Sequence, residues 1–193
     1  MCHGLYPWGG RFTEGDRMSC VAVVTLSEEF SLPLDKVALY GSMKTENLGV
    51  EKVVANVISN RNIRFLIVCG TEVRGHRSGE ALICLHRNGV DSNHRVIGAK
   101  SAIPFIENLP ADGLKRFREQ VEVVDLIGVS ELKAILDAVE DCTGRSPGPL
   151  DEAMMLEPVS SDRVLEVFHS EYALHSKVDV DLYGVVSPAP EAG

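Results

Sequence analysis

Short apolar runs rich in β-branched residues recur along the chain and alternate with segments of helical periodicity. An apolar run of this length, bounded by turn residues, is typical of a buried strand, and strands that alternate with helices form a parallel sheet. The expected strands are residues 21–26, 37–42, 64–70, 95–99 and 121–128. This pattern predicts an α/β protein with a Rossmann-like, doubly wound and mostly parallel sheet that has helices on both faces.

The segments between the expected strands carry one-sided apolar stripes. Residues 47–60 place valine or isoleucine at the spacing of a helix that packs on a sheet. The residues of that stripe are Val50, Val53, Val54, Val57 and Ile58. Further helices are expected over residues 78–89, with Gly89 as the stop, over residues 111–120, and over residues 130–142, with Ser130 as the N-cap.

The composition changes along the chain and suggests three parts. Residues 1–142 hold the expected Rossmann-like domain, behind a Gly-rich lead-in that is expected to lie on the surface. Residues 143–163 are rich in Pro, Gly and Ser, which is typical of a linker or of a strap laid across the domain. Residues 164–193 are expected to form a small C-terminal extension with a frayed tail.

The charge balance argues against some classes of partner. Acidic residues outnumber basic ones 28 to 19, and the formal net charge is -9. Nucleic acids and anionic membrane surfaces both require basic faces, so neither is an expected partner.

The sequence also indicates a compartment. No apolar run reaches the roughly 18 residues of a membrane span, and the N-terminus lacks the apolar core of a signal peptide, so a cytoplasmic location is expected. The five cysteines are dispersed without a CxxC pair, which is typical of reduced thiols.

Ligands of an open α/β sheet bind beyond the carboxyl ends of the strands, on the loops that lead into helices. Three loops are expected there, with the sequences "GSMKTENLG", "CGTEVRGHRSG" and "GAKSAIPFIENLP". Their glycines and polar residues suit a concave site for a large cofactor. A GxGxxG motif after the first strand, a Walker P-loop and a GxSxG elbow are all absent from the sequence, which argues against dinucleotide binding and serine hydrolysis.

His76 stands in the second of these loops, between Gly75 and Gly79. Two interpretations stay open. The histidine is either a polar loop residue with a local hydrogen bond, or an imidazole that reaches out of a Gly-flanked loop to ligate a metal carried in a flat macrocycle. A zinc site with Cys84 and His86 would need tertiary assembly, because those two residues lie on diverging faces of a helix.

The stretch "KTENLGVEKVVANVISNRNIRFLIVCGTEVRGHRSGEAL", followed by "GAKSAIPFIENLP" and "FREQVEVVDLIG", is dense in rare residue combinations. Together with the upstream "GDRMSCVAVVTL", it closely resembles the A-subunit family of tetrahydromethanopterin S-methyltransferase over residues 6–142. The resemblance implies a Rossmann-like domain that carries a corrinoid (cobalamin). Such a domain accepts a methyl group from methyl-tetrahydromethanopterin and passes it to coenzyme M.

The resemblance also implies roles for individual residues. His76 would ligate the corrinoid cobalt from below, while the metal cycles between cobalt(I) and methyl-cobalt(III). The other residues at the corrinoid would be Lys44, Thr45, Glu46, Asn47, Gly70, Thr71, Glu72, Gly75, Gly79, Ala102, Ile103, Pro104 and Phe105. Other corrinoid modules hold this histidine with an aspartate two residues before it. Arg74 occupies that position here, so Glu72 or a backbone carbonyl is the candidate partner.

Purely structural roles stay open for some of these residues. Thr45 or Asn47 would cap the helix that begins nearby, and residues 102–105 would belong to the core.

The function implied by the resemblance is that of a soluble corrinoid carrier, the cofactor-carrying subunit of a methyltransferase. Its partners would be methyl-donor and methyl-acceptor methyltransferase proteins. The alternatives are a corrinoid sensor or storage module without methyl transfer, and an α/β enzyme that has lost the corrinoid. Family members of the sodium-pumping membrane complex end in a transmembrane helix. No such helix is expected here, so neither are membrane anchoring and ion pumping.

Overall fold

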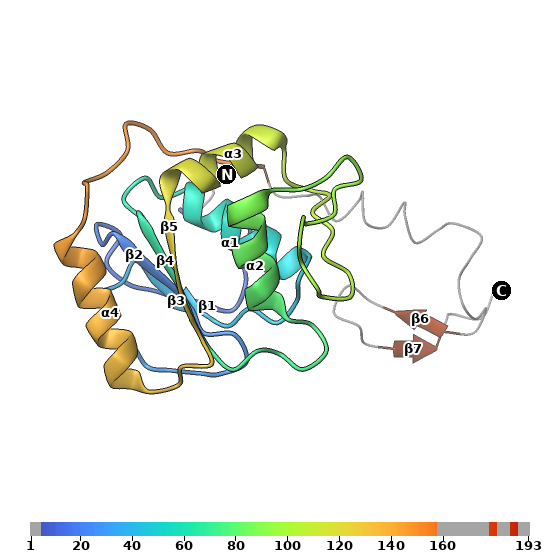
Figure 1. Cartoon of the computed structure of the whole chain (residues 1–193), viewed down its shortest axis with the longest axis horizontal. Helices are drawn as coiled ribbons and strands as arrows, with labels where there is room; N and C mark the ends of the chain where they lie inside the picture. The colour runs from blue at the N-terminus through green and yellow to red at the C-terminus, as the bar shows by residue number, and fades with distance from the viewer. Residues whose placement is uncertain (1–4, 158–177, 181–185, 189–193) are drawn as a thin grey trace. The chain divides into compact units, whose positions relative to one another are not determined.

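The computed structural model describes residues 5–157 together with the short strands at residues 178–180 and 186–188 (Figure 1). The chain forms two compact units, Met1–Pro158 and Val159–Gly193. In the second unit, β6 (Val178–Val180) and β7 (Val186–Pro188) form an antiparallel pair. All the other described elements belong to the first unit.

Five strands of the first unit form one sheet in the order β1-β3-β2-β4-β5. The strands are β1 (Phe12–Glu14), β2 (Val21–Val24), β3 (Leu39–Gly41), β4 (Phe65–Gly70) and β5 (Glu122–Ile127). The last four run parallel, and β1 pairs antiparallel with β3 at one edge. β2 and β4 are buried along their full length, as their nearly continuous apolar sequences require. The expected mostly parallel α/β sheet is confirmed.

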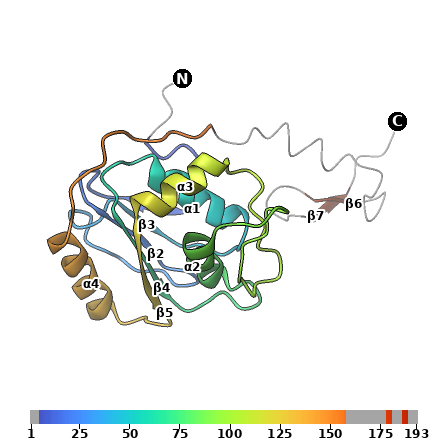
Figure 2. The same ribbon diagram turned by 45° about the horizontal axis from the view of Figure 1, so that its top comes forward.

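Helices cover both faces of this sheet, which is also confirmed (Figure 2). The helices α1 (Leu48–Ile58), α2 (Ser78–Asn88) and α3 (Ala111–Gln120) pack against one another on one face, and α4 (Leu132–Gly144) packs on β2 and β4 on the other. A hydrophobic cluster lies under α4, and its members alternate along β2 and β4 with the period of a strand. The cluster comprises Cys20, Val21, Val23, Leu32, Val37, Phe65, Ile67, Cys69, Ile135, Val139 and Cys142.

Helix α1 begins with two side-chain caps. Asn47 Oδ1 accepts a hydrogen bond from the Leu48 N–H at 2.7 Å, and Thr45 Oγ1 accepts one from the Gly49 N–H at 2.9 Å. Both capping roles that the sequence allows are therefore filled, and two N–H groups of the first turn find acceptors. The predicted stop of α2 is confirmed as well, because Gly89 ends that helix with a φ of 75°.

The predicted N-cap of α4 is wrong. The helix follows Glu131, and no side chain caps it. The Ser130 hydroxyl instead donates a hydrogen bond to Glu28 Oε1 at 2.6 Å. This contact with the loop after β2 takes the hydroxyl away from the N–H groups of the helix.

Residues 95–99 do not form the expected fourth strand. They make isolated bridges at Arg95 and Val96 within the loop between α2 and α3. Val96 is buried, but Ile97 is 46% exposed and Gly98 has a φ of 86°. The run therefore lacks the extended backbone of a strand. The place beside β4 is taken by β5, which pairs along its whole length.

The Gly-rich lead-in lies on the surface over much of its length, as its composition suggests, but its first aromatic residues are buried. Phe12–Glu14 joins the sheet as β1, and the side chains of Tyr6 and Trp8 are buried. Gly41 permits this edge strand to come close, because a Cβ there would lie 2.2 Å from the Arg11 carbonyl oxygen. Tyr6 and Trp8 are thus part of the core, whereas Phe12 is half-buried.

Residues 145–157 follow α4 without a helix or strand, and side-chain donors hold their backbone. The pairs are Arg64 Nη1 with the Gly148 carbonyl at 2.7 Å, Trp8 Nε1 with that of Leu156 at 3.2 Å, Arg61 with that of Asp151, and Arg116 with that of Glu152. Carbonyls outside regular structure need such partners. The boundaries expected at 143–163 and 164–193 stay predictions.

The cysteines of the described part of the chain, Cys20, Cys69, Cys84 and Cys142, are free thiols, in agreement with the sequence. Cys2 lies outside the described residues. Burial raises the pKa of Cys69 to about 12, so this thiol stays protonated.

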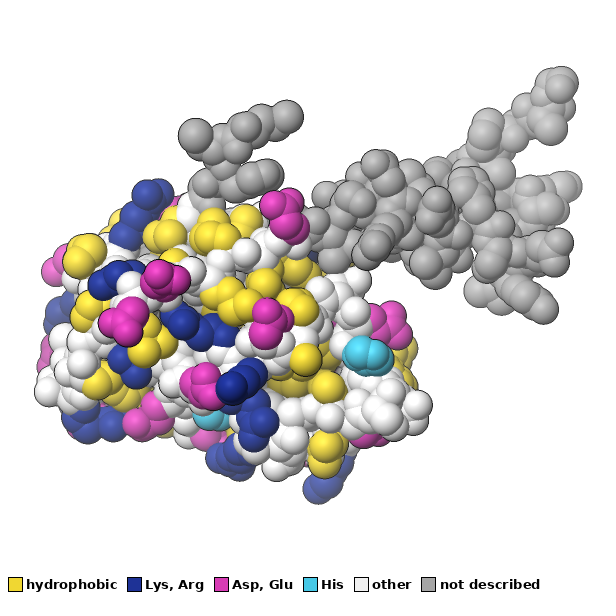
Figure 3. Space-filling view, turned by 90° about the horizontal axis from the view of Figure 1, so that it is seen from above, with side chains coloured by type: hydrophobic (Ala, Val, Ile, Leu, Met, Phe, Trp, Pro, Cys, Tyr) yellow, Lys and Arg dark blue, Asp and Glu magenta, His cyan; other side chains and the backbone are white. Residues whose placement is uncertain are grey.

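One face of the first unit is mixed in charge. On the face seen in Figure 3, acidic and basic side chains are interspersed with apolar ones. Among the helices that the structure describes, none is both long enough and apolar enough to cross a membrane.

Gln120, at the end of α3, is buried against the carboxyl end of α1. Its Nε2 lies 3.0 Å from the carbonyl oxygens of Val57 and Asn60 and 3.1 Å from that of Ile63. The last carbonyls of a helix have no partners within the helix. One amide therefore satisfies the end of α1 and ties it to α3.

Replacing Gln120 with alanine is expected to lower the free energy of unfolding by about 1–3 kcal/mol, because buried carbonyls lose their donor. Glu119→Ala is the matched control at an exposed neighbour and should change the free energy of unfolding by less than about 0.5 kcal/mol. Urea unfolding followed by circular dichroism measures both. Equal stability of the two variants would contradict the capping role.

Candidate functional site

Hydrogen bonds join three loops at the carboxyl end of the sheet. The loops are residues 42–47 between β3 and α1, residues 71–77 between β4 and α2, and residues 89–110 between α2 and α3. The Ser78 hydroxyl donates to the Met43 carbonyl at 3.0 Å, and the Ile103 N–H donates to Glu46 Oε1 at 3.0 Å. The loops singled out in the sequence thus lie together, although the third does not follow a strand.

The side chains of His76 and Glu46 meet where these loops join. His76 Nδ1 lies 2.8 Å from Glu46 Oε2. The Glu46 side chain is 3% exposed, whereas the His76 side chain is 49% exposed. A buried carboxyl group therefore holds one nitrogen of a ring that is half open to solvent.

The protonation of this pair follows from the surroundings of Glu46. Burial raises the pKa of its carboxyl group, but hydrogen bonds from the backbone N–H groups of Glu46 and Ile103 and from His76 outweigh burial, and the pKa lies below its ordinary value. An ionised carboxylate only accepts hydrogen bonds, so Nδ1 of His76 carries the proton. In the neutral imidazole, Nε2 then bears the lone pair that can bind a proton or a metal.

A tight turn presents His76. The N–H groups of His76 and Arg77 donate to the Val73 carbonyl at 3.0 and 3.3 Å. Arg77 has a φ of 48°, in the left-handed region that side chains disfavour. Gly75 has a φ of 87°, and a Cβ built on it would meet no atom within 4 Å. The tip of the loop therefore borders open space next to His76.

Glu72 is not the partner of His76, contrary to one candidate that the sequence offers. Its Oε1 accepts a hydrogen bond from the Glu80 N–H at 2.7 Å, and its Oε2 accepts one from the Gly79 N–H at 3.1 Å. The carboxylate thus caps the first turn of α2, where the helix dipole favours negative charge. Arg74 is exposed, and the partner of His76 comes from the loop after β3.

The glycines of the predicted site differ in their surroundings. Gly79 is buried, and a Cβ there would lie 3.0 Å from the methyl carbons of Leu26, so this glycine lets α2 pack closely. Gly70 has a φ of 83°, and a Cβ there would lie 2.6 Å from the Thr25 carbonyl oxygen. Of these predicted glycines, Gly75 is the one that borders open space.

The other predicted residues divide between surface and interior. Lys44, Thr71, Ala102 and Ile103 are exposed, Thr45, Asn47 and Phe105 are half-buried, and Pro104 is buried. Ile103 is 58% exposed, and Leu48, which the sequence analysis did not single out, is 46% exposed. The Ile103 N–H donates to Glu46, and Leu48 follows Glu46 by two residues. Apolar surface therefore borders the site.

Other titratable groups do not extend the site into a multidentate metal centre. In the part of the chain that the structure describes, no three His, Cys, Asp or Glu side chains are grouped so that they could hold an ion. The zinc site considered for His76, Cys84 and His86 is therefore not formed. His86 Nε2 lies 2.8 Å from the Val121 carbonyl oxygen, and burial lowers the pKa of this histidine, which indicates a neutral structural residue.

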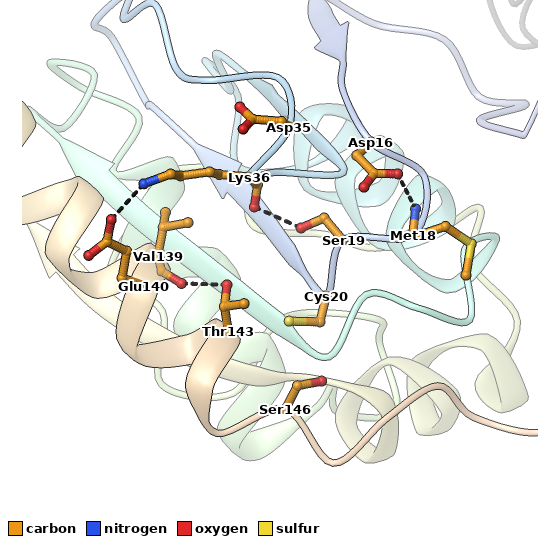
Figure 4. Close-up of a pocket in the computed structure, with 10 residues that line it drawn as sticks. All are labelled: Asp16, Met18, Ser19, Cys20, Asp35, Lys36, Val139, Glu140, Thr143 and Ser146. Atoms are coloured by element: carbon orange, nitrogen blue, oxygen red, sulfur yellow. Dashed lines mark hydrogen bonds and ion pairs between the residues drawn. The ribbon is translucent and has the colours of Figure 1, made fainter.

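A hollow of about 460 Å³ lies at the opposite, amino-terminal end of the sheet (Figure 4). It is bordered by Cys20, the residue before β2, and by side chains of α4. Lys36 Nζ and Glu140 Oε1 pair there at 2.6 Å. None of the site residues predicted from the sequence borders this hollow, so it is not the site that the sequence predicts.

Open α/β sheets bind their ligands at the carboxyl ends of the strands, and His76 presents its second nitrogen at that end. The fold and the site thus define a doubly wound α/β domain with a histidine exposed at the end of the sheet where such domains bind their ligands. Over residues 4–166 the chain matches the family model of the A subunit of tetrahydromethanopterin S-methyltransferase. It belongs to this family, and the resemblance seen in the sequence is confirmed.

Individual relatives agree. The A 1 subunit of tetrahydromethanopterin S-methyltransferase from Methanothermobacter marburgensis is 47% identical over 150 residues, which are 76% of this chain and 63% of the relative. The A 2 subunit of the same organism is 46% identical over 79% of this chain and 84% of the relative. The A subunit of the putative methyltransferase Mtx of Methanosarcina barkeri is 47% identical over 68% and 66%. The chain spans less than two thirds of the first relative.

Substituting Glu46 with glutamine is expected to move the ring proton of His76 from Nδ1 to Nε2. Glu46 accepts hydrogen bonds from both Ile103 and His76, whereas a glutamine amide has a single acceptor oxygen. If the Ile103 N–H keeps that oxygen, the amide NH2 faces Nδ1, which must then accept. Nitrogen–proton NMR correlation spectra of the imidazole at neutral pH report the tautomer.

Glu72→Gln is the matched control, because it makes the same change in a carboxylate that caps α2 instead. This variant should keep the proton of His76 on Nδ1. The assignment of Glu46 fails if Glu46→Gln keeps the wild-type tautomer, or if both variants change it alike.

Proposed function

We propose that this chain is a corrinoid carrier of a methyl-transfer system, with His76 as the lower axial ligand of the cobalt. The observation that carries the proposal is the 2.8 Å contact between His76 Nδ1 and Glu46 Oε2, which leaves Nε2 available for a metal. A metal-binding histidine commonly gives its other nitrogen to a carboxylate, which fixes the tautomer and orients the ring. Membership of the A-subunit family supports the methyl-transfer role.

The residues of the site fit a corrinoid better than a bare metal ion. A corrin ring would itself supply most of the ligands of its cobalt, so a single nitrogen from His76 would suffice to hold the metal. A bare zinc ion would need three or four protein ligands, which the described residues do not gather. Gly75 leaves the backbone open beside His76, and the exposed Leu48 and Ile103 offer apolar surface to a broad ring.

A bound corrinoid supplies a cobalt centre that takes up a methyl group and gives it up again. The residues of the chain bind and orient this group. Glu46 keeps a proton on Nδ1 of His76, so that Nε2 bears the lone pair for the metal. The same hydrogen bond would hold the ring in one orientation, because it engages Nδ1 and leaves Nε2 free.

The proposed partners are a methyl-donor and a methyl-acceptor methyltransferase protein, and methyl-tetrahydromethanopterin is the proposed source of the methyl group. Relatives of the chain are named as subunits of tetrahydromethanopterin S-methyltransferase, which supports action within an assembly. The half-exposed His76 side chain is in keeping with a site that opens toward other molecules.

The purified protein, mixed with hydroxocobalamin and desalted, should retain a stoichiometric amount of corrinoid. His76→Ala should weaken binding by at least about 10-fold and shift the visible bands of cobalt(III), because the axial nitrogen is lost. Absorption spectroscopy measures both effects. His94→Asn is the control, since His94 is an exposed loop histidine with a φ of 60°, which asparagine tolerates.

Loss of all corrinoid from the wild-type protein on desalting would rule out the carrier. Corrinoid that stays bound to His76→Ala with an unchanged spectrum would remove His76 from the axial position. A holoprotein that exchanges no methyl group with any methyltransferase would instead be a corrinoid store or sensor.

A further inference from the structure

The carboxylate of Glu28 joins three loops at the carboxyl end of the sheet. Its Oε1 accepts hydrogen bonds from the Thr71 N–H at 3.0 Å, from Thr71 Oγ1 at 2.5 Å and from the Ser130 hydroxyl at 2.6 Å. Glu28 follows β2, Thr71 follows β4 and Ser130 follows β5. One carboxylate oxygen thus fastens the ends of three neighbouring parallel strands, and these three residues are called the Glu28 clamp.

The clamp is itself held in place. The Glu28 N–H donates to the Thr25 carbonyl at 3.0 Å, and the Glu28 carbonyl accepts from Thr25 Oγ1 at 2.7 Å. The N–H and the hydroxyl of Ser27 donate to the Thr71 carbonyl at 3.2 and 2.7 Å. Hydrogen bonds from Ser130 and Thr71 lower the pKa of Glu28, so the carboxylate is ionised and accepts charge-assisted bonds.

The clamp includes the first residue of the loop that carries His76, which is Thr71. From β2 the chain proceeds to β3 on one side, and from β4 it proceeds to β5 on the other, so the β2–β4 boundary is the switch point where such sheets open a crevice for ligands. Thr71 begins the loop of residues 71–77, and Glu72 fastens that loop to the first turn of α2. Hydrogen bonds therefore fix the loop that carries His76 both where it leaves β4 and where it enters α2.

We propose that Glu28 is a positioning residue of the corrinoid site, which sets the direction of the His76 ring through Thr71. This role rests on the proposed function. No hydrogen bond among the described residues joins Glu28 to His76 or Glu46, so the effect passes through the backbone of the loop. Glu46 fixes the tautomer and turns the ring toward its own loop, whereas Glu28 fixes the backbone from which the ring extends, so the direction of the lone pair depends on both.

The role of the clamp is separable from the stability of the fold. Thr71 and Ser130 are exposed, so water can satisfy their donors when the carboxylate is removed. The residues of the clamp also stand beyond the ends of the strands, outside the buried strands themselves. Loss of Glu28 is therefore expected to change the conformation of the His76 loop and to have little effect on the free energy of unfolding.

The test compares Glu28→Ala, Glu28→Gln and Glu29→Ala after loading with hydroxocobalamin. Glu28→Ala should shift the cobalt(III) spectrum toward that of His76→Ala and should weaken corrinoid binding roughly 2- to 30-fold. Glu28→Gln keeps one acceptor oxygen and should restore the wild-type spectrum. Glu29→Ala removes the neighbouring exposed carboxylate and should behave as the wild type. Urea unfolding of the apoproteins verifies that each variant is folded.

A Glu28→Ala holoprotein with the spectrum and affinity of Glu29→Ala would overturn the role of Glu28 and leave the proposed function intact. A wild-type protein that retains no corrinoid would remove the proposed function and this role with it. Where Glu28→Ala does not fold, Ser130→Ala decides the question, because it deletes one exposed donor of the clamp. A smaller shift in the same direction supports the clamp, and a wild-type spectrum overturns it.

Discussion

A carboxylate buried in a protein must fill its hydrogen-bonding capacity, and the way in which Glu46 does so determines the arrangement of the site. One oxygen accepts from the Ile103 N–H and the other from His76. The single side chain therefore fastens the loop after β3 to the loop after β4 and to the connection between α2 and α3. Because the carboxylate is ionised, the imidazole has one tautomer available, with its free nitrogen away from Glu46.

Much of the fold can be predicted from the sequence because its signals are local. β2 and β4 are continuous apolar runs, and the caps of α1 stand in the residues just before it. The prediction of a strand at residues 95–99 is wrong because a short apolar run also occurs in a loop that buries one side chain, here Val96. β1 is missed for the opposite reason, since Phe12–Glu14 is short and mostly exposed and is defined by its pairing with β3.

The sequence predicts which loops form the site, but it does not predict which side chains contact each other there. His76 and Glu46 both stand in the loops that the sequence singles out, but their contact spans 30 positions of sequence. It depends on how two neighbouring loops turn toward each other. Glu72 is the nearer carboxylate along the chain, yet the N-terminus of α2 competes for it and holds both oxygens. A sequence pattern within one loop does not show whether a carboxylate binds a helix N-terminus or a histidine of the same loop.

The carboxyl-terminal boundary of the domain is defined by hydrogen bonds to residues 145–157 and not by the end of the last helix. A chain cut after α4 would keep every helix and strand of the first unit. It would also leave four side chains without the carbonyls that they now hold, namely Trp8, Arg61, Arg64 and Arg116. Since Trp8 is buried, water would gain access to the core at that point. The smallest fragment that keeps this interior closed therefore extends to Leu156, well beyond the last helix.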